Sequence, residues 1–568
     1  MQARLTLWPA VLGALFALTF APDPLPAWSL GWVQLVVLAI VAHWGFSRTP
    51  RQAALSGLMF GLATFAVGLY WLTISMHVYG QMALPLAWLA LLLFSLYLAL
   101  YPALALGLTA WLLQRTPNLH PLKLLWLASV WASAWTLAEM LRGVIFTGFP
   151  WLSTAYGQTD TWIAGWSVAL GAPGSTWVTA WIAGAVAATL AAEAKQRDST
   201  VTPKRALAVA LAIVLAFVGA LLQQTNFTEA AGEPLIARLV QGNVDQGIKF
   251  DNQRFNQAHE HHLGLARHQA KGQTGAANTP PNSDSDSDNL DSTAQPDLIL
   301  LPETIMARLS NRVPAQHWQD WIDVATTQNT TVLLGAPLYG PEPGRYTNSV
   351  IAVDGQSTPT QLAQGLASDR YDKQHLVPFG EFVPTGFRWF IDLMQIPLGD
   401  FNRGGPEQAP FAIAHQKVAP NICYEDIFGA ELLPAVRQGA TILANFSNLG
   451  WFGNSSALRQ HWQMARFRSM ETRRPTLRAT NTGITGAIDP SGRVIAQLPV
   501  LTAGYVDVRV QGHTGLTPYA QWGNYPMWIL VCVILGIGLF GRLRRLDTAN
   551  GLKDRNKPST SNNPSKAE

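Results

Sequence analysis

Long apolar runs and one long segment of mixed polarity alternate along this chain. Seven apolar runs fill the first 225 residues and one more lies near the C-terminus. Each is long enough to cross a bilayer as a helix. The runs have the approximate edges 5–21, 28–45, 54–76, 84–113, 123–141, 163–193, 206–223 and 524–541. The sequence therefore predicts a multi-pass α-helical membrane bundle over 1–225 and an eighth transmembrane helix over 524–541.

Two of these runs carry additional signals. The first follows a very short basic start, as a signal peptide would, but Asp23 and three prolines follow it, and six more runs come after it within the first 225 residues. We interpret it as an uncleaved span. The sixth contains Gly171-Ala-Pro-Gly174, where we expect a break because Pro and Gly interrupt helices.

Residues 232–510 alternate between short β-rich runs and helical patterns, which predicts an α/β domain with layered sheets. Strands are expected at 235–240, 297–301, 331–338, 346–353, 418–422 and 440–446, with a hairpin around 489–492. Helices are expected at 252–269, 317–327, 430–438 and 456–471. The Ser/Asp-rich stretch 271–296 is expected to be a disordered insertion, and 542–568 a basic tail.

Charge supports the membrane interpretation and predicts an orientation. Only 13% of the residues are charged, against about 25% in soluble domains. Arg and Lys occupy alternate loops, around Arg4, Arg48, Arg115, Lys195 and Arg542, while the other loops carry almost none. Positive loops stay on the cytoplasmic side. Both termini are therefore expected in the cytoplasm and 232–510 on the opposite face, the periplasm of a Gram-negative cell.

Cys423 is one of only two cysteines and sits in Val418-Ala-Pro-Asn-Ile-Cys-Tyr-Glu-Asp. The other, Cys532, lies in the last apolar run and cannot pair with it. A solitary thiol in an oxidising compartment is either buried and inert or used as a nucleophile. We favour use, because a carboxylate (Glu303) and an ammonium (Lys373) occur in the same domain, as acyl transfer through a thioester requires.

Glu303 and Cys423 each follow a predicted strand, and ligands of α/β sheets bind at that edge. Lys373 and Glu381 flank Leu376-Val-Pro-Phe-Gly380, which is typical of a rigid, partly buried loop. The sequence therefore predicts that residues 120 positions apart meet at one site.

Other charged clusters have plainer interpretations. His259-Glu-His-His262 lacks the spacing of a zinc motif, so we interpret it as a solvated helix face. Glu139 and Arg142 end the fifth run, where a structural ion pair and a lipid-headgroup contact are both open.

These motifs together resemble the carbon–nitrogen hydrolase (nitrilase) superfamily, and the chain from about 5 to 542 resembles its membrane members, the bacterial apolipoprotein N-acyltransferases. The matching segments are Gln241-Gly-Asn, Leu301-Pro-Glu-Thr, Lys373-Gln-His-Leu-Val-Pro-Phe-Gly-Glu, Ile422-Cys-Tyr-Glu, Ser447-Asn, Trp451-Phe-Gly, Arg478-Ala-Thr-Asn and Phe146-Thr-Gly-Phe-Pro-Trp151. The sequence departs from the pattern at Phe250, where Trp is common, and at Leu449, where Asp is usual.

The resemblance implies a nitrilase-like αββα sandwich on the bundle, in a bacterial inner membrane. It implies acyl transfer from a phospholipid, typically phosphatidylethanolamine, to the N-terminal diacylglyceryl-cysteine of an apolipoprotein. No metal, soluble cofactor or nucleic acid is implied.

The resemblance also implies roles. Cys423 would be the nucleophile, Glu303 the general base and Lys373 the oxyanion stabiliser, with Glu381, Tyr424 and Glu425 in support. Two alternatives stay open: a membrane-anchored amidase that gives the acyl group to water, and a transporter or receptor whose polar domain only binds ligand.

Overall fold

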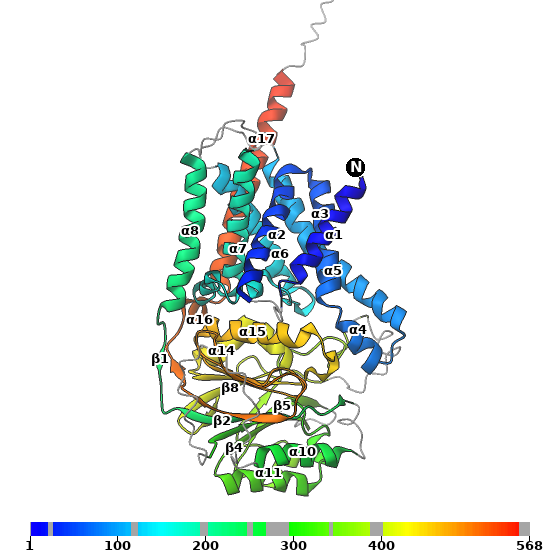
Figure 1. Cartoon of the computed structure of the whole chain (residues 1–568), viewed down its shortest axis with the longest axis vertical. Helices are drawn as coiled ribbons and strands as arrows, with labels where there is room; N and C mark the ends of the chain where they lie inside the picture. The colour runs from blue at the N-terminus through cyan, green and yellow to red at the C-terminus, as the bar shows by residue number, and fades with distance from the viewer. Residues whose placement is uncertain are drawn as a thin grey trace, which may run out of the picture.

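The computed structural model describes residues 2–20, 27–114, 123–193, 203–246, 254–267, 295–339, 345–384, 386 and 401–555. Long helices gather at one end of the molecule and two sheets with their covering helices at the other (Figure 1). The long described helices are α1 (Gln2–Ala17), α2 (Ala27–Ser47), α3 (Pro50–Gly68), α5 (Leu84–Leu113), α6 (Lys123–Arg142), α7 (Trp166–Glu193), α8 (Pro203–Gln224) and α17 (Tyr525–Arg555). The predicted insertion 271–296 lies almost entirely outside the described residues, and Phe250 lies outside them too.

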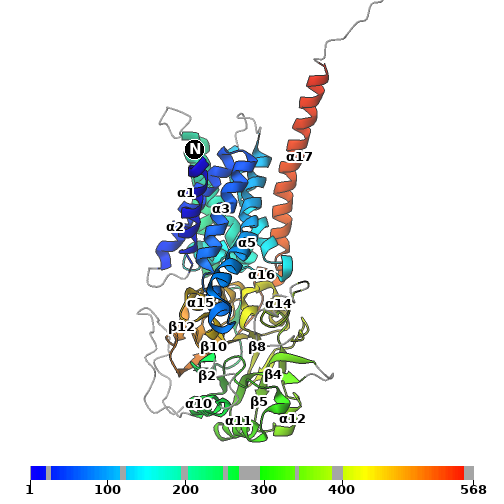
Figure 2. The same ribbon diagram turned by 90° about the vertical axis from the view of Figure 1, so that its right-hand side faces the viewer.

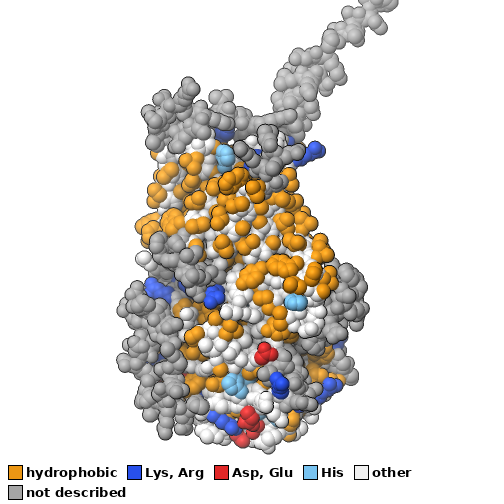
Figure 3. Space-filling view, turned by 45° about the vertical axis from the view of Figure 1, so that its right-hand side comes forward, with side chains coloured by type: hydrophobic (Ala, Val, Ile, Leu, Met, Phe, Trp, Pro, Cys, Tyr) orange, Lys and Arg blue, Asp and Glu red, His pale blue; other side chains and the backbone are white. Residues whose placement is uncertain are grey.

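The surface of this helical end is apolar. Figure 3 shows hydrophobic side chains covering the bundle, with acidic side chains confined to the other half of the visible face. Among the described residues, six helices are long and apolar enough to cross a membrane, or seven if one bent pair counts as a single span. The first predicted span is the short apolar helix α1. The prediction of a multi-pass bundle is confirmed, with the span count matched approximately.

The span predicted over 54–76 is bent. Helix α3 ends at Gly68, and the next helical segment, α4 (Leu72–Ile74) with a π-helical turn to Tyr79, is bent from it by 58°. The Trp71 indole N–H donates to the Gly68 carbonyl at 3.1 Å, which satisfies a backbone acceptor at the break. Residues 69–79 contain no Pro, the usual sequence signal of a kink, and the hydrophobicity of the run continues through the bend. The bend could therefore not be predicted from the sequence.

The described strands form two six-stranded sheets and a two-stranded ribbon. One sheet has the order β13-β2-β3-β4-β5-β6 and the other β12-β11-β10-β9-β8-β7. The first contains β2 (Leu235–Gln241), β3 (Leu298–Leu300), β4 (Thr331–Tyr339), β5 (Tyr346–Val353), β6 (Arg370–Asp372) and β13 (Gly504–Val510). The second contains β7 (Phe411–Ile413), β8 (Gln416–Ile422), β9 (Ile442–Ser447), β10 (Thr476–Thr480), β11 (Gly486–Ile488) and β12 (Val494–Gln497), and the ribbon pairs β1 (Glu229–Ala230) with β14 (His513–Thr514).

The two sheets pack face to face, and each is covered by helices on its other face. Leu298 and Leu300 join the core between the sheets, whereas Ile299 packs against the outer helices, because successive side chains of a strand point to opposite faces. The outer helices are α10 (Phe255–Arg267), α11 (Ala315–Gln328) and the short α12 (Pro359–Ala363) on one side, and α14 (Gly429–Arg437), α15 (Ser456–Thr472) and α16 (Pro518–Trp522) on the other. This arrangement confirms the predicted αββα sandwich.

The α14–α15 layer faces the bundle, so helix α15 lies between the sheets and the membrane-spanning helices (Figures 1 and 2). Helix α17 runs beside the bundle and extends past the other helices. It continues to Arg555, whereas the sequence analysis ended the span at 541.

Helix α7 breaks where Gly171-Ala-Pro-Gly174 predicted it. Gly171 has φ 67° and ψ −169°, a combination open essentially only to glycine. The freed Ala172 N–H donates to Glu471 Oε1 of α15 at 2.7 Å, and Arg468 Nε lies 3.0 Å from Glu471 Oε2. A carboxylate from the polar half of the molecule therefore caps the second part of a bundle helix.

We predict that Gly171→Ala destabilises the protein by at least about 1–3 kcal/mol, the cost of a disallowed backbone conformation. A Cβ at Gly171 would also lie 2.3 Å from the Tyr519 ring. Gly264→Ala is the matched control, because a Cβ in the middle of α10 meets nothing within 4 Å. It should leave the protein as stable or more stable by about 0.5–1 kcal/mol. Thermal unfolding in detergent measures both; equal melting temperatures for the two variants would contradict the argument.

Candidate active site

Glu303 and Cys423 stand at the carboxyl ends of parallel strands in different sheets. Glu303 follows β3, and Cys423 directly follows β8, where it begins a 3₁₀ turn over Cys423–Ile427. Cys423 has φ 53°, the left-handed region that non-glycine residues rarely enter. Such a conformation persists only where the surroundings enforce it.

Lys373 joins two buried carboxylates. Its Nζ lies 2.9 Å from Glu381 Oε1 and 3.4 Å from Glu303 Oε1. Asn348 Nδ2, from β5, donates to the same two oxygens at 2.8 Å each. The side chains of Glu303, Lys373 and Glu381 are at most 9% exposed. Water therefore competes little for the hydrogen bonds and ion pairs of this cluster.

The remaining oxygens of the two carboxylates accept backbone N–H groups. Glu381 Oε2 accepts from Val377 N at 2.8 Å, which closes the loop that Lys373 begins. Glu303 Oε2 accepts from Asn448 N at 3.0 Å, in the loop after β9. Glu303 is thus held by three separate segments, and the structure brings Glu303, Lys373 and Glu381 together.

The electrostatics of Cys423 follow from this cluster. Burial raises the pKa of the Cys423 thiol, and the Glu303 carboxylate raises it further, while the Lys373 ammonium acts in the opposite direction. Burial lowers the pKa of Lys373, but Glu381 and Glu303 outweigh it and hold the pKa above its ordinary value. At neutral pH the site thus holds an ammonium and a protonated thiol.

Glu425 ties the Lys373 loop to the nucleophile turn. Its Oε1 accepts the N–H groups of Gln374 at 2.7 Å and His375 at 3.1 Å. Its Oε2 accepts Ile422 N at 2.6 Å and the Tyr371 hydroxyl at 2.9 Å. Burial raises the pKa of Glu425 to about 7, although the three backbone hydrogen bonds and the Lys373 ammonium act in the opposite direction.

Tyr424 connects the nucleophile turn to the bundle. Its hydroxyl donates to the Gly148 carbonyl at 3.2 Å, in the loop after α6. Its ring packs against His375 and Phe428, with centroids 5.6 and 5.1 Å away. The residue after Cys423 is therefore in direct contact with a loop of the membrane-spanning part.

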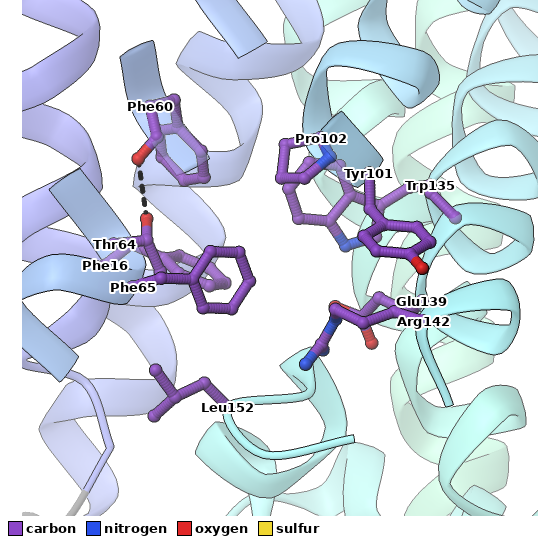
Figure 4. A pocket seen from close by; sticks show the side chains of 11 residues that line it. Phe16, Phe60, Thr64, Phe65, Tyr101, Pro102, Trp135, Glu139, Arg142 and Leu152 are labelled. Carbon is purple, nitrogen blue, oxygen red and sulfur yellow. Dashed lines mark hydrogen bonds between the residues drawn. The ribbon is translucent and has the colours of Figure 1, made fainter. Parts of the chain in front are cut away.

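Glu139 and Arg142 hold that same loop. Arg142 Nη1 donates to the carbonyls of Phe149 at 2.7 Å and Trp151 at 2.5 Å, and Glu139 accepts from the N–H and hydroxyl of Thr154. Figure 4 shows both side chains at one end of a cavity walled by aromatic rings. Its volume is about 20 Å³, which holds about one water molecule. Both charges thus serve as hydrogen-bonding anchors of the loop.

Two sequence interpretations need correction or completion. The interpretation of 259–262 as a solvated face is wrong for His259 and His262, which are buried, and His259 Nε2 lies 3.0 Å from Asp320 Oδ2. Among the described residues no three His, Cys, Asp or Glu side chains form a metal-binding group. Leu449 is buried, and its loop is held instead by Asn448, whose Oδ1 accepts from Gln246 and Asn481.

The sequence analysis missed Asn348, which bridges both carboxylates. Asn348 lies in the polar triplet Thr347-Asn348-Ser349 at the start of β5, so its sequence neighbours do not distinguish it. It also missed a buried group behind the nucleophile turn, Asp426, His461 and Arg478.

Comparison with known proteins agrees with this architecture. Residues 12–185 match the apolipoprotein N-acyltransferase N-terminal domain and residues 289–519 match carbon–nitrogen hydrolase. The chain is 46% identical to the apolipoprotein N-acyltransferase of Bordetella bronchiseptica, over 93% of this chain and 95% of that one. It is 40% identical to that of Ralstonia nicotianae, over 95% and 94%.

Solved carbon–nitrogen hydrolase structures resemble part of the chain weakly. An amidase from Nesterenkonia sp. is 15% identical, with a TM-score of 0.34, and covers 53% of this chain and 97% of its own. The long matches to relatives, and the two family regions that they span, are decisive: this chain belongs to the apolipoprotein N-acyltransferase family, within the carbon–nitrogen hydrolase superfamily.

Proposed function

We propose that the protein transfers an acyl chain from a phospholipid, through a thioester on Cys423, to the α-amino group of the N-terminal diacylglyceryl-cysteine of an apolipoprotein. Phosphatidylethanolamine is the proposed donor. One observation carries the proposal: the turn that begins at Cys423 has the Glu303–Lys373–Glu381 cluster nearby and, through Tyr424, touches the bundle. The nucleophile turn therefore lies on the side of the sandwich that faces the bundle, from which a membrane lipid would come.

The proposed first half-reaction forms the thioester. Glu303 takes the proton of the Cys423 thiol as Sγ attacks the ester carbonyl, since the raised thiol pKa leaves little thiolate before the attack. Lys373 and the backbone N–H of Tyr424 stabilise the tetrahedral oxyanion. The intermediate collapses, the lysophospholipid alkoxide leaves, and Glu303 returns the proton to it.

In the second half-reaction the neutral α-amino group of the acceptor attacks the thioester. Glu303 accepts a proton from the attacking nitrogen, and Cys423 leaves as a thiol once that proton reaches it. Glu381 keeps Lys373 oriented, and Glu425 keeps the Lys373 loop against the nucleophile turn. Burial of the site limits water, which favours an amine acceptor over hydrolysis.

We further propose an arrangement in a bacterial inner membrane with both termini in the cytoplasm and the catalytic domain in the periplasm. The alternating distribution of Arg and Lys among the loops supports it. The proposed domains are the bundle over 1–225, the catalytic domain over 232–510, the last helix over 524–541 and the tail over 542–568.

The first test is the intact mass of detergent-purified protein after incubation with phosphatidylethanolamine and no acceptor. We expect an added acyl mass that neutral hydroxylamine removes and that a diacylglyceryl peptide discharges. Cys423→Ala should lack the adduct, while Cys532→Ala, altered on an exposed position of α17, should form it normally. Free fatty acid without an adduct would instead favour a hydrolase, and an adduct on Cys423→Ala would refute the assigned nucleophile.

Lys373→Ala should slow acyl-enzyme formation by about 10²–10³-fold, the effect of losing one oxyanion donor. The fold should persist, because Asn348 and the N–H groups of Val377 and Asn448 still donate to the two carboxylates. Lys417→Ala, which removes an exposed lysine from β8, is the matched control and should react at the wild-type rate. Single-turnover mass spectrometry measures the rates; a normal rate for Lys373→Ala would exclude the oxyanion role.

Glu303→Gln should abolish transfer and yet lower the pKa of Cys423. The Glu303 carboxylate raises that pKa, so a neutral amide in its place lets the thiolate form at lower pH. Ultraviolet titration of the thiolate, in a Cys532→Ala background, measures the shift. Glu407→Gln, at an exposed position, should change neither property. A thiol pKa that rises or stays unchanged in Glu303→Gln would contradict the proposed electrostatics.

A further inference from the structure

A buried ionic group lies directly behind the nucleophile turn. Asp426 belongs to the turn itself, His461 to α15 and Arg478 to β10. His461 Nε2 lies 2.5 Å from Asp426 Oδ1, and Arg478 Nη1 lies 2.5 Å from Asp426 Oδ2. Arg478 Nη2 lies 2.5 Å from His461 Nδ1. All three residues are at most 2% exposed.

The hydrogen-bond donors in this group determine which nitrogen of the His461 imidazole carries a proton. A guanidinium can only donate, so His461 Nδ1 accepts from Arg478 and carries no proton. Nε2 therefore carries the proton and donates to Asp426. Burial lowers the pKa of His461, which agrees with a neutral ring. The group then consists of one carboxylate, one guanidinium and a neutral imidazole that each contact the other two, with its charges balanced.

The same stretch of α15 binds the bundle. The Trp151 ring stacks on His461, with centroids 5.5 Å apart and planes 20° apart. The indole N–H groups of Trp151 and Trp71 both donate to Oε1 of the adjacent Gln460, at 2.7 and 3.2 Å. Trp71 comes from the break after α3, and Trp151 from the loop after α6. Two consecutive residues of α15 thus contact two separate parts of the membrane-spanning half.

We propose that His461 is a positioning residue, which fixes the nucleophile turn against the bundle so that Cys423 keeps its left-handed conformation beside Glu303 and Lys373. The inference rests on the proposed role of Cys423. The strained backbone at Cys423 needs an external constraint. Asp426, three residues later, is fixed by two charge-assisted hydrogen bonds whose donors belong to α15 and β10.

The test compares His461→Phe with His461→Gln. Phe keeps a ring for Trp151 but loses both hydrogen bonds, whereas the Gln amide can still donate to Asp426. We expect acyl-enzyme formation to fall at least about tenfold in His461→Phe and to stay within about threefold of wild type in His461→Gln. The pH profile of Cys423 alkylation by iodoacetamide should shift in His461→Phe alone, since Glu303, Lys373 and Glu381 then act on a displaced thiol.

His259→Phe is the matched control for loss of stability. His259 is equally buried and also lies beside a carboxylate, Asp320, but on the outer layer of the sandwich. The His259→Phe substitution should lower the melting temperature while leaving the acylation rate and the pH profile of Cys423 alkylation unchanged. An unchanged rate and profile in folded His461→Phe, or the same loss in His259→Phe, would overturn the proposal.

Alkylation separates this inference from the proposed function, because it needs no lipid. If wild-type protein forms no acyl-enzyme, the proposed function fails. A shifted alkylation profile in His461→Phe would then still support the positioning role, and an unshifted one would reject it.

Discussion

The pairing of one buried ammonium with two carboxylates is the interaction on which the site depends. Lys373 holds Glu303 and Glu381 in a region where none of the three is more than slightly exposed. Removing such charges from water is costly unless each polar atom finds a partner. Asn348, Val377 and Asn448 supply those partners, so the cluster fixes the loop after β9 as well as the Lys373 loop.

The cluster comes close to Cys423 because the two sheets pack face to face. Glu303 ends a strand of one sheet and Cys423 ends a strand of the other, and the leucines and valines between them set their separation. Glu425 then crosses the same boundary, because it follows β8 and binds backbone groups after β6. The geometry of the candidate active site therefore depends on how the two sheets pack. Mutations in the core between the sheets should change the position of the Cys423 thiol relative to Glu303 and Lys373.

Hydrophobic patterning and residue chemistry predict those features of the fold that have a local signal in the sequence. The apolar runs predicted the bundle, and Gly171-Ala-Pro-Gly174 predicted the break in α7, because both signals are local. The bend after Gly68 was not predicted, because a long-range contact stabilises it. Trp71 at the bend donates to Gln460, which is 389 residues away in the sequence. Short edge strands such as β6 and β7 were missed because three residues show no periodicity.

In the candidate site, too, local sequence signals could be recognised, whereas contacts between residues far apart in the sequence could not. Glu303, Lys373 and Cys423 could be proposed as site residues because their functional groups are chemically distinctive and flank strands or rigid loops. Asn348 is neutral and sits inside a strand, so nothing in its neighbours reveals that it faces two carboxylates. Asp426, His461 and Arg478 come together only in the folded chain, 35 and 52 positions apart. The buried His259 was misjudged because its partner, Asp320, lies on another helix.

The cap on the broken helix α7 has a mechanical consequence. Glu471 receives the Ala172 amide at the positive end of a helix dipole, and Arg468 balances its remaining oxygen. Pulling the sandwich away from the bundle would expose this ion pair and leave the helix end without an acceptor. The two halves should therefore move as one body, because hinged separation of the sandwich from the bundle would break this contact.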